Sequence, residues 1–151
     1  MKKVCIIGGG TISYVRTHLA LCAPAFGTTA RSLHEICKKK FDKMTVSTEF
    51  TKMAGGGTSI TTNEDVQKWI DRKKDDLNTK VIFFNVAICD FDGNVMKAYE
   101  STPSGKYCER LKTSNGIQAM KLTPADKIVK TIREGRKDIF LVAFKTTSGA
   151  T

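Results

Sequence analysis

The feature that most restricts the fold of this chain is an almost unbroken apolar run at residues 81–88. A strand with one solvated face alternates apolar and polar residues, whereas a strand of a parallel sheet is covered on both faces and is apolar throughout. The run has the length of a strand and is far shorter than the ~20 residues that a membrane-spanning helix needs. We therefore expect a central strand of a parallel sheet here, and no transmembrane segment.

Segments typical of strands and of helices alternate along the rest of the chain. Strands are expected at residues 3–7, Thr45–Phe50, 117–122 and 138–144, and helices at Thr28–Lys40, after the caps Thr61 and Thr62, and from Thr123 to Gly135. Such alternation gives right-handed crossovers between parallel strands. The predicted fold class is α/β, with three layers and a mostly parallel sheet, in a single domain over residues 1–151. The connection at about 93–116 lacks periodicity and is expected to be a mobile loop.

The charge balance favours anionic partners. Twenty-five Lys and Arg residues against fifteen Asp and Glu give a net charge of +10, which suits nucleic acid, acidic membranes or phosphorylated metabolites. The basic stretches contain no aromatic stacking platform and no nucleic-acid motif, which argues against nucleic acid. The five cysteines form no Cys-x-x-Cys pair, so a disulfide framework or zinc site is not expected. Only four apolar residues precede the first glycines, too few for a secretory signal, so a cytoplasmic location is predicted.

A glycine run follows the first expected strand. Residues 8–13 read Gly-Gly-Gly-Thr-Ile-Ser and nearly fit the dinucleotide pattern G-x-G-x-x-G, with Ser13 in place of the third glycine. One interpretation is a turn whose backbone N–H groups approach a phosphate, and the other is a tight turn at a strand end. Because ligands of α/β sheets bind beyond the carboxyl ends of the strands, we favour the phosphate.

Polar residues near other strand ends are further candidates. Asp90 follows the central strand and suits a ribose, a base or a hydrated Mg²⁺, although the sequence at 90–93 also favours a turn. Asn85 interrupts the apolar run and suits a ligand contact or a structural hydrogen bond. Thr123 and Pro124 suit a helix start that binds an anion or is simply capped. The last expected strand ends near Lys145, Thr146 and Thr147.

Short motifs over essentially the whole chain occur in a familiar order. They are residues 4–11 with Val15 and Arg16, then 85–91, 109–112, 121–124 and 141–144. Together they resemble phosphopantothenoylcysteine synthetase, the ligase domain often fused to a flavin decarboxylase in bacterial coenzyme A biosynthesis. The resemblance implies a Rossmann-like fold that activates the carboxylate of phosphopantothenate with CTP and Mg²⁺, and then lets cysteine attack the acyl-cytidylate.

The resemblance also implies roles for particular residues. The implied nucleotide-binding residues are Gly9, Gly10, Thr11, Asn85, Val86, Asp90, Pro124 and Phe144. Arg16 and Gly27 are implied in the acyl or phosphate pocket, and Arg110, with Lys106 or Lys112, as the catalytic cation. Mg²⁺ is expected to bind through the nucleotide, without a direct protein ligand. The expected partners are nucleotide and small phosphorylated metabolites, without a membrane partner, and the chain is a candidate homodimer.

Three departures from the family pattern keep an alternative open. Residues 17–27 lack the asparagine that holds the acyl-cytidylate, with Ala20 or a neighbour at its place, and Arg110 stands where the family has lysine. The family also continues beyond its Val-Ala-Phe strand, whereas this sequence ends at Thr151, so we expect a compact form or a fragment. The alternative function is a nucleotide-binding module of the same fold that has lost the ligase chemistry.

Overall fold

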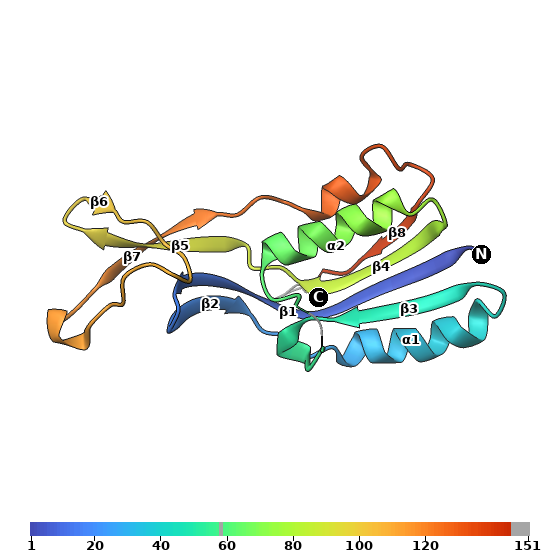
Figure 1. Ribbon diagram of the computed structural model, residues 1–151, viewed down its shortest axis with the longest axis horizontal. Helices are drawn as coiled ribbons and strands as arrows, with labels where there is room; N and C mark the ends of the chain where they lie inside the picture. The colour runs from blue at the N-terminus through green and yellow to red at the C-terminus, as the bar shows by residue number, and fades with distance from the viewer. Residues whose placement is uncertain (58, 146–151) are drawn as a thin grey trace, which may run out of the picture.

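The structure is a computed structural model that describes residues 1–57 and 59–145. Its strands and α-helices, in chain order, are β1 (Lys3–Arg16), β2 (Leu19–Ala23), α1 (Thr28–Lys40), β3 (Thr45–Phe50), α2 (Asn63–Asp75), β4 (Thr79–Ala87), β5 (Phe91–Lys97), β6 (Glu100–Ser101), β7 (Ala119–Pro124) and β8 (Phe140–Ala143). Three short 3₁₀ helices lie between them: η1 (Lys52–Ala54), η2 (Thr113–Asn115) and η3 (Val129–Arg133). Figure 1 shows their arrangement.

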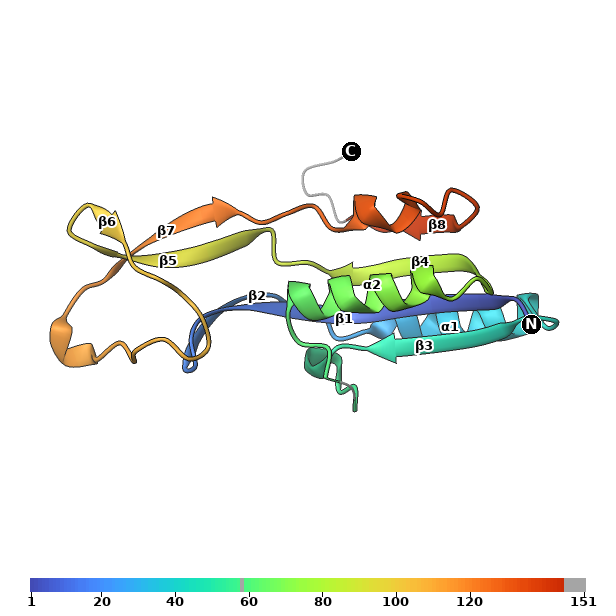
Figure 2. The same cartoon turned by 45° about the horizontal axis from the view of Figure 1, so that its top comes forward.

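The main sheet is parallel in its central part. Its strands lie in the order β3-β1-β4-β8, and each neighbouring pair is parallel. The helix α1 covers one face of this sheet, and α2 covers the other, together with η3 (Figures 1 and 2). The predicted three-layer α/β class with a mostly parallel sheet is therefore confirmed, and β4 is a central strand as its apolar run indicated.

Alternating side chains of β1 supply both faces of the core. Val4 and Ile6 pack into the cluster with α1, whereas Cys5 and Ile7 belong to the cluster that contains Trp69 of α2. All of these side chains are buried. Each large apolar side chain removed from water in this way contributes about 1.5–3 kcal/mol to folding. The two clusters explain why β1 lies between the helical layers.

The helix α2 begins at a complete capping box, which confirms Thr62 as its N-cap. The Thr62 hydroxyl accepts the Asp65 N–H at 3.2 Å, and the Asp65 carboxylate accepts the Thr62 N–H at 3.0 Å. Two N–H groups that the first helical turn leaves without partners are satisfied in this way. Trp69 is buried on the inner face of the helix, whereas Leu77 lies beyond the end of the helix and is exposed.

A second, antiparallel sheet extends beyond the parallel sheet. Its strands lie in the order β6-β5-β7. β2 pairs with the distal part of β1 from Thr11 to Arg16, and both project in the same direction as this second sheet (Figures 1 and 2). We call residues 91–124 the arm. Part of the connection expected to be a loop at about 93–116 is instead a strand, because β5 pairs with β7 from Phe91 to Met96.

Two further predictions of secondary structure are corrected. The helix expected to start at Thr123 is absent, because Thr123 and Pro124 belong to β7, and only the short η3 forms later. The strand expected at residues 138–144 is shorter, because β8 spans Phe140–Ala143; it lies at the sheet edge and leaves Phe140 66% exposed. Thr146 and Thr147 lie outside the described residues.

Candidate functional site

A cavity of about 710 Å³ opens beyond the carboxyl ends of β4 and β8. Its volume falls in the range of small-molecule sites, and the carboxyl ends of parallel strands are where α/β proteins bind ligands. It is lined by Pro24, Ala25, Thr29, residues 84–88, Asp90, Asp126, Lys127, Ile128, Val129, Ala143, Phe144 and Lys145. The wall thus brings together four of the predicted nucleotide-binding residues, Asn85, Val86, Asp90 and Phe144, from segments far apart in the sequence.

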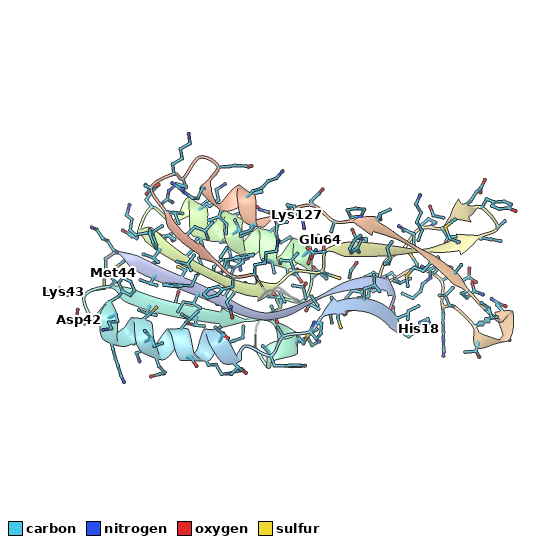
Figure 3. The ribbon with its side chains drawn as sticks, turned by 180° about the vertical axis from the view of Figure 1, so that it is seen from behind. His18, Asp42, Lys43, Met44, Glu64 and Lys127 are labelled. Carbon is cyan, nitrogen blue, oxygen red and sulfur yellow. The ribbon has the colours of Figure 1, made fainter. Side chains whose placement is uncertain are left out.

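An exposed ion pair lies at the wall of this cavity. The Lys127 ammonium is 3.1 Å from Asp90 Oδ1, and the two side chains are 69% and 62% exposed. A surface pair of this kind contributes at most about 1 kcal/mol, so a ligand can replace it at little cost. Figure 3 shows Lys127 near the junction between α2 and the arm. No sequence pattern indicated Lys127, because a single lysine outside a recognised motif has the same appearance as any solvated surface residue.

Thr11 fixes the segment that leads from β4 to Asp90. Its hydroxyl accepts the Cys89 N–H at 2.9 Å and lies 3.0 Å from the Ala87 carbonyl oxygen, to which it donates. Asn63 at the start of α2 donates from Nδ2 to the Cys89 carbonyl at 2.9 Å. Thr11 is completely buried and lies outside the cavity wall. Its role in the described part of the chain is therefore to orient the segment that carries Asp90.

The glycine run is part of a strand, so the turn predicted at residues 8–11 is wrong. β1 continues through Gly8, Gly9 and Gly10, and Gly8–Gly10 pair with β4. A Cβ at Gly8 would lie 2.3 Å from the Ala30 Cβ of α1, and a Cβ at Gly9 would lie 2.1 Å from Thr51 Oγ1. Protein atoms therefore occupy the space above these glycines.

Gly10 has a specific effect on the cavity. A Cβ at this position would lie 2.2 Å from the Ala23 carbonyl oxygen and 2.8 Å from the Ala25 nitrogen. The absence of a side chain lets the chain after β2 cross closely over β1. This crossing places Pro24 and Ala25 in the cavity wall. Gly10 thus affects the shape of the cavity indirectly, because it allows the backbone after β2 to approach β1.

Arg16, predicted for the acyl or phosphate pocket, is buried and bound to protein oxygens. Its guanidinium donates to the carbonyl oxygens of Glu109 at 2.6 Å, Pro103 at 3.0 Å and Val15 at 2.7 Å. Only 5% of the residue is exposed. Arg16 therefore ties the end of β1 to the arm. Gly27, the other residue predicted for that pocket, is the N-cap of α1, with a φ of 82°.

The predicted catalytic cations lie on the arm. Arg110 and Lys112 are exposed and, like Pro124, lie outside the wall of the 710 Å³ cavity. Lys106 lines a separate cavity. Within the described ranges, no three His, Cys, Asp or Glu side chains gather in a way that holds a metal ion. None of the described helices is long and apolar enough to cross a membrane.

The strand order, the helix on each face and the cavity at the strand ends define a Rossmann-like α/β protein. No protein-family model matches the chain, and no curated protein sequence matches it. Among solved structures, it is similar to the crystal structure of the DNA/pantothenate metabolism flavoprotein from Streptococcus pneumoniae. The TM-score is 0.72, and the match covers 93% of this chain and 68% of that one at 16% sequence identity. At this identity, the likeness shows a shared fold.

Proposed function

We propose that the cavity at the ends of β4 and β8 binds CTP, and that the chain is a ligase that joins phosphopantothenate to cysteine. The observation that carries the proposal is the convergence of Asn85, Val86, Asp90 and Phe144 on one cavity of nucleotide size. These are residues that the resemblance to phosphopantothenoylcysteine synthetase implies in the nucleotide site. The fold likeness to a flavoprotein of pantothenate metabolism supports the same proposal.

The proposed reaction has two steps. A carboxylate oxygen of phosphopantothenate attacks the α-phosphorus of CTP, and pyrophosphate leaves. The neutral cysteine amine then attacks the acyl carbon, the bond to the cytidylate oxygen breaks and CMP leaves. The new amide keeps one amine proton, and the other passes to solvent. The residues at the site suit a Mg²⁺ that arrives with the nucleotide, because the wall carries the carboxylates of Asp90 and Asp126 and hydrated Mg²⁺ needs few protein ligands. When bound, this ion neutralises charge on the phosphates.

The nucleotide part is tested by calorimetric titration with CTP and ATP. Asp90→Asn should weaken CTP binding by about tenfold or more, because a hydrogen bond to a charged group contributes about 1.5–3 kcal/mol. The matched control is Asp42→Asn, which removes an equal charge from an exposed turn far from the cavity (Figure 3). Unchanged CTP affinity in the Asp90 variant would show that this residue is not part of the site.

A second candidate function, nucleotide binding without ligation, is favoured by the position of the arm. Arg110 and Lys112 lie outside the cavity wall, and Arg16 is bound to carbonyl oxygens. Pyrophosphate release from CTP, Mg²⁺ and phosphopantothenate distinguishes the two functions, and cysteine should accelerate this release if the chain is a ligase. If the protein binds CTP tightly but releases no pyrophosphate at high protein concentration over hours, the ligase function is refuted and nucleotide binding without ligation remains.

A further inference from the structure

The positive charge of the chain is concentrated at one end of the parallel sheet. Four segments lie together there, residues 1–3, 38–43, 72–80 and 133–138, around the start of β1, the ends of α1 and α2, and the turn before β8. They contain thirteen Lys and Arg residues and five Asp and Glu residues, so eight of the ten net positive charges lie in them. We call these four segments the basic end. It lies opposite the arm (Figures 1 and 2).

The cavity proposed for CTP does not account for this charge. Its wall carries two carboxylates and two ammonium groups, from Asp90, Asp126, Lys127 and Lys145. The cavity lies at the carboxyl ends of β4 and β8, whereas the basic end lies at their amino ends. Figure 3 shows Lys43 of the basic end well apart from Lys127. A concentration of charge that is separate from the cavity attracts an anionic partner of its own.

Many cations of the basic end have no carboxylate partner. The exceptions include the Lys3 ammonium, 2.6 Å from Asp76 Oδ2, and Lys80 and Arg136, which both contact Asp138. The exposed basic residues that form no ion pair within residues 1–57 and 59–145 include Lys38, Lys39, Lys40, Lys43, Arg72 and Lys137. Because the protein does not neutralise these side chains, they are available to an anionic surface.

Large apolar side chains are exposed among these charges. Leu77, between α2 and β4, is 74% exposed, and Phe140, at the start of β8, is 66% exposed. Such side chains contribute little to contacts with the phosphates of nucleic acid, but they bury apolar surface when they enter the headgroup region of a lipid bilayer. Exposed cations together with exposed apolar side chains are the combination that holds peripheral proteins on anionic membranes.

We propose that the basic end binds the surface of a membrane that contains anionic lipids. Leu77 and Phe140 enter the headgroup region, and the lysines at 38–43 contact the lipid phosphates. The arm, at the opposite end, then points away from the lipid surface. This proposal departs from the expectation that the chain has no membrane partner, and it does not depend on CTP binding or ligation.

The first test measures how much of the whole chain sediments with lipid vesicles. The protein should bind vesicles of phosphatidylcholine mixed with phosphatidylglycerol and not vesicles of phosphatidylcholine alone, and added salt should weaken the binding. Duplex DNA and polyglutamate, each at the same concentration of negative charge as the vesicles, represent nucleic acid and an acidic protein. Equal binding to the two kinds of vesicle, or complete release by either competitor, would overturn the proposal.

Charge variants show whether the basic end is the surface that binds. Each Lys or Arg close to an anionic membrane raises the binding constant about fivefold, so Lys38→Gln combined with Lys39→Gln should weaken vesicle binding by about tenfold or more. The matched control combines Lys97→Gln with Lys121→Gln, which removes two exposed cations from the arm. An equal loss of affinity in both double variants would mean that only net charge matters, and would refute binding through the basic end.

A fluorescence measurement that does not depend on charge establishes the orientation. Leu77→Trp places an indole at the basic end, and Tyr107→Trp places one on the arm, where the native tyrosine is 91% exposed. Trp69 is fully buried and shielded from lipid in both variants. On anionic vesicles with brominated acyl chains, emission of the first variant should be quenched and emission of the second should not. No quenching in the Leu77 variant, or equal quenching in both, would contradict the proposal.

Discussion

The Gly8→Ala substitution tests whether the glycine run serves packing or phosphate binding. The new Cβ would lie 2.3 Å from the Ala30 Cβ, whereas carbon atoms in contact lie about 3.5–4.0 Å apart. Neither side chain has a torsion that relieves this overlap, so β1 and α1 must separate. Overpacking of this kind costs about 1–3 kcal/mol, although alanine in place of glycine would otherwise favour a strand interior by about 0.5–1 kcal/mol.

A second substitution isolates the contact. Ala30→Gly removes the methyl group that the new Cβ would meet, at a cost of about 1 kcal/mol for glycine in a helix. If the overlap between the two methyl groups causes the destabilisation by Gly8→Ala, the variant with both substitutions should be about as stable as Ala30→Gly alone. The coupling energy between the two sites should then be about 1–3 kcal/mol.

The free energy of unfolding is measured by urea titration with Trp69 fluorescence. Trp69 is the single tryptophan and is fully buried, so its emission reports on the core. If the changes in free energy of unfolding of the two single variants sum to that of the double variant within about 0.5 kcal/mol, the packing explanation is refuted. A Gly8→Ala protein of unchanged stability that no longer binds CTP would restore the phosphate-turn interpretation.

Two further predictions concern Asp65 and Arg16. Burial raises the pKa of the Asp65 carboxyl, but hydrogen bonds from the Thr62 and Thr61 backbone and the Thr62 side chain outweigh it and hold this pKa below its ordinary value of 3.8. The stabilisation by the ionised Asp65 carboxylate is therefore present above about pH 4 and is lost as the pH falls through the lowered pKa. Asp65→Asn should lower the free energy of unfolding by about 1 kcal/mol at pH 7, and the variant should lose less stability than the parent in acid. A urea midpoint that shifts equally at pH 7 and pH 3 on substitution would contradict this. Arg16→Leu should leave the parallel sheet folded but speed amide hydrogen exchange at residues 102–109, and unchanged exchange there would show that its hydrogen bonds do not hold the arm.

Local sequence patterns predicted the elements whose periodicity is unambiguous. The apolar run at 81–88 indicated a central strand, and the predicted caps Thr61 and Thr62 indicated the start of α2. Asp90 follows that strand and Asn85 interrupts its apolar run, and both line the cavity. In each case the signal is carried by residues close together in the chain.

The features that the sequence did not predict depend on contacts between distant segments. A glycine run has the same appearance in a turn and in a strand, and the strand at Gly8 is possible because Ala30 of α1 presents only a methyl group. Thr123 and Pro124 resemble a helix start, but pairing with β5 places them in β7. Lys127 is part of the cavity because the segment after β7 returns to the parallel sheet, which residue spacing does not encode.

The length of β1 has a consequence for folding kinetics. β1 precedes both of its partners in the parallel sheet, β3 at Thr45–Phe50 and β4 at Thr79–Ala87, so its pairing with β4 waits until β4 and all the segments between them have been synthesised. Loops of this size must close before the pairing contributes free energy, and parallel sheets accordingly fold slowly. Until β4 arrives, one hydrogen-bonding edge of an apolar strand stays open to pairing with other chains. The yield of refolded protein should therefore fall as the protein concentration rises, even under conditions where the native state is stable.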